Sequence, residues 1–185
     1  NKIAKMEEFL SHNSTIELVS KKPKVLVINT GGTFGFQMSN PGPTDKVYFS
    51  KNYLLTELKC GSYSTLNYNF DFGENLLEND FVKYWIYEID PLLDSADMDM
   101  AHWNLICNLI KQAYYCFDGF VILHGTNTMT YSASALSFMI NNLTKPIVFT
   151  GSIIPFSMDG SDAVGNLEGA LMIAATKVDF LQLSQ

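Results

Sequence analysis

The sequence predicts an α/β protein built on a parallel, mostly three-layer α/β/α sheet. Four apolar runs of three to five residues end abruptly in polar loops, as buried parallel strands do. Segments with apolar residues at helical spacing follow the last three runs. Hydrophobic residues make up 47% of the 185 residues, so a substantial core can form. This alternation is typical of a parallel sheet covered on both faces.

Each predicted strand leads into a polar loop. Because every strand-to-helix loop of a parallel sheet lies at the same edge, these loops should converge on one ligand site. The predicted strands are Val25–Ile28, Trp85–Ile89, Phe120–Leu123 and Ile147–Phe149, and their loops contain Thr30–Thr33, Asp94–Asp97, His124–Thr128 and Thr150–Ser152.

Three helices are predicted between and after these strands. The first runs through Leu105 and Ala113, with Asp99 as its N-terminal signal. The second is Tyr131–Ile140, and the third carries an apolar stripe over Ala163–Ala174. Two segments are predicted to be irregular: a loop at 41–43 and an insertion at 59–79.

We place a polar extension at residues 1–22 and one α/β domain at 23–185. The net charge of -7, without a basic run, disfavours nucleic-acid binding. No apolar run is long enough to cross a bilayer. Three cysteines without a C-x-x-C spacing indicate neither a disulfide framework nor a zinc site, and a reducing, cytoplasmic compartment fits best. Cys107 and Cys116 are expected on one helix as small core residues.

The first polar loop is Thr30–Gly35, with the letters TGGTFG. Its glycines allow a sharp turn and a close approach of backbone to a ligand. A plain strand-to-helix turn is an equally good interpretation, whereas a nucleotide loop lacks the required G-x-G-x-x-G or G-K-S/T letters. A threonine hydroxyl at a strand end becomes a nucleophile if a base activates it.

The second loop, His124–Met129, again places hydroxyls between a strand and a helix. Thr126 is the better chemical candidate because Gly125 frees the backbone beside it. Thr128 is equally suited to capping the helix, and His124 is expected to bond to the backbone.

The third loop begins with Asp94 and Ser95, short polar groups suited to holding an ammonium and a carboxylate. Asp97 and Asp99 are alternative helix caps.

These motifs together resemble the bacterial-type asparaginase family, and the residues Asp94–Ala96 and Tyr131–Met139 resemble its type I, cytosolic branch. The resemblance runs from about Lys24 to Lys177 and implies the fold of an asparaginase N-terminal domain. It rests on Thr30–Thr33, Asp94–Ser95, Asp118–Thr126, Lys145–Ser152 and Asn166–Leu167.

The resemblance implies an amidohydrolase that converts L-asparagine to L-aspartate and ammonia through a threonine nucleophile and an acyl-enzyme. The nucleophile would be Thr33 or Thr126, and Tyr48 would help to activate Thr33. No metal or organic cofactor is implied, the partner is the small-molecule substrate, and the full-length protein would be a homo-oligomer. The implied substrate-binding residues are Thr30, Asp94, Ser95, Ala96 and Asn127.

Two departures from the family pattern bear on activity. Asn127 stands where the family has an aspartate that holds the α-ammonium of the substrate. The family's catalytic lysine and its C-terminal domain would follow Gln185. We therefore expect little activity from these 185 residues alone. Two alternatives stay open: the ammonia-releasing subunit of a tRNA-dependent amidotransferase, and a non-catalytic amino-acid-binding module.

Overall fold

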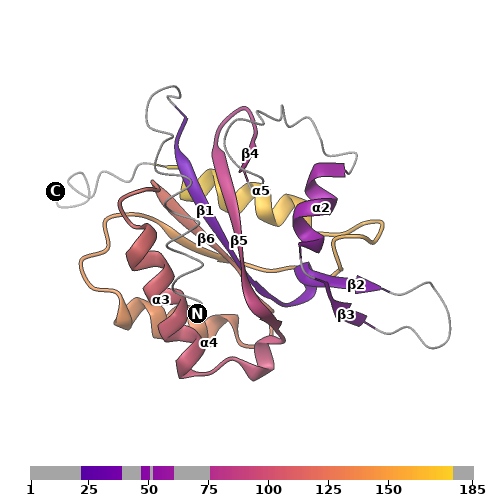
Figure 1. Cartoon of the computed structure of the whole chain (residues 1–185), viewed down its shortest axis with the longest axis horizontal. Coiled ribbons are helices and arrows are strands. Elements are labelled where there is room, and N and C mark those ends of the chain that lie inside the picture. The colour runs from indigo at the N-terminus through magenta and orange to yellow at the C-terminus, as the bar shows by residue number, and fades with distance from the viewer. Residues whose placement is uncertain (1–21, 39–46, 51, 61–75, 177–185) are drawn as a thin grey trace.

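The computed structural model describes residues 22–38, 47–50, 52–60 and 76–176. Its centre is a five-stranded sheet of order β4-β5-β1-β6-β7, with a separate hairpin of β2 and β3 at one side (Figure 1). The strands are β1 (Lys24–Gly31), β2 (Phe36–Met38), β3 (Val47–Phe49), β4 (Leu76–Glu78), β5 (Lys83–Leu93), β6 (Gly119–Leu123) and β7 (Ile147–Thr150).

The sheet is parallel except at one edge. Strand β1 pairs in parallel with β5 on one side and with β6 on the other. Strand β7 extends the sheet in parallel from β6, whereas β4 runs antiparallel to β5. The chain moves from β1 to β5 and then returns across β1 to β6, so the strand order reverses between β1 and β6. Ligands of open α/β sheets bind beyond the carboxyl ends of the strands at such a reversal.

Helices cover both faces of the sheet and complete the predicted three layers (Figure 1). One apolar core lies between the sheet and α3 with α4, and the other lies between the sheet and α2 with α5. Single 3-10 turns, η1 and η3, follow β1 and β5. The helical elements are η1 (Thr33–Gly35), α2 (Tyr53–Cys60), η3 (Ser95–Asp97), α3 (Met100–Ala113), α4 (Met129–Met139) and α5 (Ala163–Ala174).

Alternate residues of β1 enter opposite cores. Val25 and Val27 pack on the α5 side, and Leu26 and Ile28 pack on the α3 side, all with no exposed surface. This follows from the two-residue period of a strand. Each such side chain stabilises the fold by about 1.5–3 kcal/mol through burial. The uninterrupted apolar letters of β1 are therefore the signature of a central strand.

Several elements lie beyond the sequence predictions. The helix α2 and the β2–β3 hairpin were not predicted, and the irregular insertion predicted at 59–79 is wrong at both ends, where α2 and β4 lie. These elements are too short for apolar periodicity to reveal them. Residues 61–75 and the loop predicted at 41–43 fall outside the described residues.

Strand β5 is longer than predicted, because it continues through Asp90 and Pro91 to Leu93. The pairing with β1 shifts register there, so that Asn29 faces Glu88 but Gly31 faces Leu93. This irregularity accommodates a proline, which donates no ladder hydrogen bond. The polar loop after β5 consequently begins later than the strand prediction implied.

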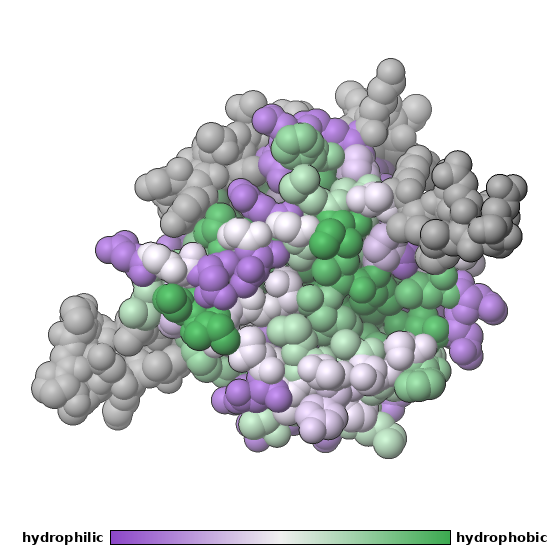
Figure 2. All heavy atoms as spheres, turned by 180° about the vertical axis from the view of Figure 1, so that it is seen from behind, coloured by the Kyte–Doolittle hydropathy of each residue, from purple (hydrophilic) through white to green (hydrophobic). Residues whose placement is uncertain are grey.

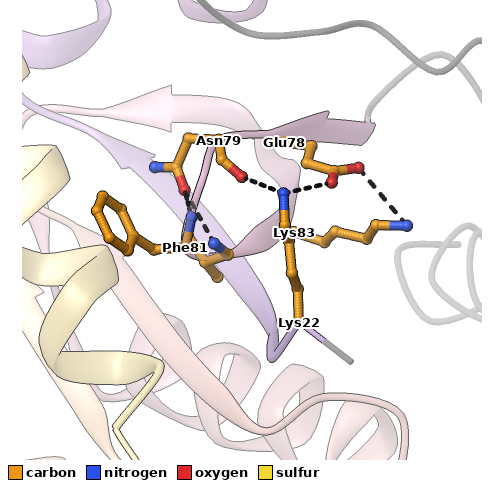
Figure 3. Close-up of polar contacts among 6 residues, drawn as sticks. Lys22, Glu78, Asn79, Phe81 and Lys83 are labelled. Carbon is orange, nitrogen blue, oxygen red and sulfur yellow. Dashed lines mark hydrogen bonds and ion pairs between the residues drawn. The ribbon is translucent and has the colours of Figure 1, made fainter. Parts of the chain in front are cut away.

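A polar cluster secures the antiparallel edge, at the turn between β4 and β5 (Figure 3). The ammonium of Lys22 lies 2.8 Å from a carboxylate oxygen of Glu78 and donates to the Asn79 carbonyl at 2.8 Å. Lys83 approaches the other Glu78 oxygen at 3.5 Å, and the Asn79 side chain accepts from the N–H of Phe81 at 2.9 Å. Lys22, the last residue of the predicted extension, is thus bonded to this edge of the sheet, and residues 1–21 lie outside the described residues.

The α5 face of the molecule carries exposed apolar side chains. Figure 2 shows apolar side chains gathered over the middle of this face, and α5 contributes the exposed side chains of Met172 and Ile173. Within the described ranges, no helix has the length and apolar character needed to cross a membrane.

Cys107 and Cys116 do not share a helix. Cys107 is half-buried on α3, whereas Cys116 follows that helix and is exposed. The prediction that both are core residues is therefore wrong for Cys116, because α3 ends at Ala113. Asp99 is confirmed as the N-cap of α3, where it accepts a hydrogen bond from the His102 N–H.

Candidate active site

Two glycines bring the loop after β1 against its neighbours. Gly31 and Gly32 have φ angles of +118° and +69°, which side-chain-bearing residues rarely adopt. A Cβ on Gly31 would lie 2.2 Å from the Leu93 carbonyl oxygen, and a Cβ on Gly32 would lie 2.5 Å from the Cα of Gly125. Only glycine therefore lets the end of β1 touch both the end of β5 and the loop after β6.

The loop after β6 makes a matching contact with the loop after β5. A Cβ on Gly125 would lie 2.5 Å from the Ser95 Oγ. Thr33 directly follows Gly32, and Thr126 directly follows Gly125. Three loops that are far apart in sequence thus meet at one point, with a predicted site hydroxyl at or beside each contact.

Internal hydrogen bonds hold the first loop in place. The buried Asn29 side chain accepts from the Gly31 N–H at 3.1 Å and donates to Glu88 at 3.1 Å. The Thr30 hydroxyl donates to the Leu123 carbonyl at 2.9 Å. Since its one proton is committed to β6, Thr30 can offer a ligand only an oxygen lone pair.

Ser95 presents a buried hydroxyl that has no hydrogen-bond partner within the described part of the chain. Its side chain is 2% exposed. Its backbone is well anchored, because Asp94 accepts from the Ala96 N–H at 2.9 Å and Thr128 donates to the Ser95 carbonyl at 2.6 Å. An unsatisfied buried hydroxyl costs about 1–3 kcal/mol, so such a group usually serves a ligand or an ordered water.

The loop after β7 adds a second hydroxyl of this kind, on Ser152. Ser152 is 1% exposed and its Oγ has no partner among the residues described. The adjacent Gly151 lies against the nucleophile candidate, since a Cβ on it would be 3.2 Å from the Thr126 Cγ2. This loop was predicted to converge with the others, but no site role was predicted for Ser152. Its position after a buried strand was the available signal.

Asp162 and Asn166 fold the loop after β7, and neither was predicted to do so. The Asp162 carboxylate accepts from the N–H groups of Ile153 and Ile154 at 3.0–3.1 Å. The hydrogen bond from Ile154, followed by that from Ile153, lowers the pKa of Asp162. Asn166 donates to both Asp162 and the Gly151 carbonyl at 2.9 Å. Asp162 precedes α5 but makes no side-chain cap, because its oxygens serve the loop instead.

His124 is confirmed as a residue that bonds to the backbone. Its ring is 1% exposed, with Nδ1 2.7 Å from the Gly125 carbonyl oxygen and Nε2 2.8 Å from the Ser132 Oγ. Burial lowers the pKa of His124, against the opposing effect of the hydrogen bond to Gly125. The neutral ring is therefore favoured.

The remaining predicted residues take different positions. Asn127 is exposed in the turn before α4, and the cap position of that helix is occupied by Thr128, whose side chain makes no capping bond. Ala96 lies exposed in η3. Tyr48 pairs with Gln37 in the β2–β3 hairpin, and its side chain lies outside the described residues.

A hollow of about 410 Å³ lies beside the loops, between β3 and the carboxyl half of β5. None of the predicted site residues lines it. Both Glu88 oxygens are already engaged, with Asn29 and with the Asn52 N–H at 2.7 Å. We therefore locate the candidate site at the meeting of the loops. The hollow is lined by Phe49, Glu88, Ile89, Asp90, Pro91 and Leu92.

The fold and these loops define a class of protein. It is a three-layer α/β domain with hydroxyl groups at the strand reversal. Thr126 lies just before the N-terminus of α4, whose partial positive charge favours negative charge. Such an arrangement suits nucleophilic attack on an acyl carbon, as in amide hydrolysis.

Comparison with known proteins specifies this class. The protein-family model for the asparaginase N-terminal domain matches residues 24–181 of this sequence. L-asparaginase 1 of Escherichia coli is 41% identical over 155 residues, which cover 84% of this chain and 41% of that protein. The crystal structure of L-asparaginase I from Vibrio cholerae superimposes with a TM-score of 0.66 at 38% identity, over 84% of this chain and 42% of the other.

The chain therefore belongs to the asparaginase family, and it spans about two-fifths of the length of these two relatives. A shorter match, 36% identical over 105 residues, joins it to one subunit of the glutamyl-tRNA(Gln) amidotransferase of Thermoplasma volcanium. That match covers 57% of this chain and 25% of the amidotransferase polypeptide.

Proposed function

We propose that the complete protein carrying this chain is an amidohydrolase that converts L-asparagine to L-aspartate and ammonia. The contact of Gly125 with Gly32 and Ser95 supports the proposal, because Thr33 and Thr126 directly follow the two glycines and the Ser95 hydroxyl has no partner among the described residues. The family relationship supports the same chemistry. A cytoplasmic, homo-oligomeric enzyme without a metal fits this proposal.

In the proposed reaction, a threonine oxygen attacks the side-chain amide carbon of the substrate. Its proton passes to the departing amine, ammonia leaves, and a water molecule hydrolyses the acyl-enzyme. Thr126 and Thr33 are the two candidate nucleophiles, with Tyr48 assisting Thr33. Ser95 offers the substrate a hydroxyl that has no partner among the residues the structure describes, whereas Thr30 offers a lone pair. Asp94 and Ala96 line the same loop, and Asn127 faces solvent beside Thr126.

Ammonia release from L-asparagine tests the proposal in the complete protein. We expect turnover with L-asparagine in the absence of tRNA or any partner protein. Release that requires charged tRNA and a second protein chain would instead support an amidotransferase, which the match to the Thermoplasma volcanium protein makes the alternative. Binding of L-asparagine without ammonia release under either condition would indicate a non-catalytic binding module.

Restoring a carboxylate at Asn127 should strengthen substrate binding. If position 127 contacts the α-ammonium, Asn127→Asp places a negative charge about 4 Å from a positive one, an attraction of roughly 4 kcal/mol at an effective dielectric near 20, before desolvation. A quarter of that, on the order of 1 kcal/mol, corresponds to about fivefold in affinity. The Michaelis constant for L-asparagine should fall accordingly.

An analogue without the α-amino group is the control for this prediction. The gain should largely vanish with the analogue, because it has no ammonium to contact. Equal Michaelis constants for the parent and the variant with L-asparagine would remove Asn127 from the substrate site. A capping effect is a poor alternative explanation, since Thr128 occupies the cap position.

A further inference from the structure

We propose that Trp103, Ser132 and His124 form a directional hydrogen-bond chain that fixes the Gly125 carbonyl and thereby positions Thr126. The inference rests on the proposed function only for its kinetic consequence. In this role His124 is a positioning residue and not a general base.

The chain runs across two helices to the active-site loop. The Trp103 indole N–H, on α3, donates to the Ser132 Oγ on α4 at 2.9 Å. The Ser132 Oγ lies 2.8 Å from His124 Nε2, and His124 Nδ1 lies 2.7 Å from the Gly125 carbonyl oxygen. Ser132 has no exposed surface and His124 is 1% exposed, so bulk water does not compete for these groups.

The chemistry of its two ends determines the direction of the chain. The Trp103 N–H can only donate, and the Gly125 carbonyl can only accept. His124 must therefore carry its proton on Nδ1. In the neutral ring Nε2 is then an acceptor, and it takes the single proton of the Ser132 hydroxyl. Ser132 and His124 each accept one hydrogen bond from the Trp103 side and donate one toward Gly125. A charged His124 carries a proton on both nitrogens, so it could no longer accept from Ser132.

The anchored carbonyl belongs to the peptide bond that joins Gly125 to Thr126. Gly125 has no side chain to restrain it, and its Cα lies against Gly32 and Ser95. Rotation of this peptide would move the Thr126 backbone, and with it the hydroxyl. A misplacement of about 1 Å can cost an enzyme on the order of 100-fold in rate. Because both ring nitrogens are engaged inside the protein, His124 has no free nitrogen for the substrate.

Nitrogen NMR of the complete protein labelled with 15N-histidine tests the direction without reference to activity. At neutral pH, His124 should show a protonated Nδ1 and an unprotonated Nε2, with its signal assigned by its loss in His124→Asn. An Nε2–H tautomer or an imidazolium in this sample would overturn the proposal.

Kinetics with L-asparagine test the positioning role. Trp103→Phe and Ser132→Ala keep the packing but break the chain, so kcat should fall by about 10- to 100-fold while KM changes by less than about threefold. Ser134→Ala, at an exposed position of the same helix, is the matched control and should change neither. His124→Asn places an amide N–H near the Nδ1 position, whereas His124→Gln places one near Nε2. The asparagine variant should therefore retain more kcat.

The outcomes separate this inference from the proposed function. Equal kcat in Ser132→Ala and Ser134→Ala, or a glutamine variant faster than the asparagine variant, would overturn the positioning role even in an active asparaginase. The expected tautomer in a protein that does not hydrolyse L-asparagine would overturn the proposed function, while leaving the hydrogen-bond chain in place. Thermal midpoints of each variant, measured alongside, ensure that kcat refers to folded protein.

Discussion

Thr126→Ala should lower the kcat of the complete protein for L-asparagine by on the order of 10⁴-fold or more, as loss of a nucleophile does in other hydrolases. The residue that loses its hydroxyl directly follows Gly125, which contacts Gly32 and Ser95. Ammonia release measures the effect. Thr130→Ala, an exposed position in the first turn of α4, is the matched control and should stay within about twofold of the parent, as surface changes usually do.

The same assay on Thr33→Ala distinguishes the two threonines. Both variants should be slow, but only the variant that lacks the nucleophile should fail to form an acyl-enzyme. Mass spectrometry of protein quenched during turnover detects the adduct. Full activity in Thr126→Ala, with loss in Thr33→Ala, would show that the loop after β6 does not carry essential chemistry.

Gly32→Ala should destabilise the fold by about 2–4 kcal/mol, the sum of backbone strain and overpacking. Its φ of +69° disfavours a side chain, and the new Cβ would lie 2.5 Å from both the Cα and the N of Gly125. Backbone atoms cannot move aside as a flexible side chain does. Urea denaturation followed by circular dichroism gives the free energy of unfolding.

Gly165→Ala is the control with the opposite sign. Gly165 lies inside α5, and no described atom outside the helix's own backbone lies within 4 Å of the Cβ that alanine would add. The higher helix propensity of alanine should raise the free energy of unfolding by about 0.8–1 kcal/mol. If the Gly32 variant were as stable as the parent, the close contact between the loops after β1 and β6 would not exist in the folded protein.

The sequence by itself determined the elements whose signal is local. Uninterrupted apolar runs identified β1 and β6, because strands buried on both faces have no polar positions. The apolar run of β7 also predicted a strand, although its residues are only half-buried. The helix over Ala163–Ala174 was predicted with the bounds of α5, although its outer face is also apolar. Asp99 predicted the start of α3, because its capping hydrogen bond spans only three residues. The polar loops could be located because each directly follows a strand in the sequence.

Only the tertiary structure decided what depends on distant partners. β4 is a strand because β5 pairs with it, and β5 continues past Pro91 because Gly31 and Leu93 pair after a shift of register. It also decided which hydroxyls are available. In the sequence, Thr30 and Ser95 are equally suitable hydroxyl groups for a ligand. In the structure, the Thr30 hydroxyl donates to a carbonyl of β6, whereas the Ser95 hydroxyl has no partner among the described residues. The partner of Thr30 lies 93 residues away in the sequence, and no local pattern records where such a distant group comes to lie.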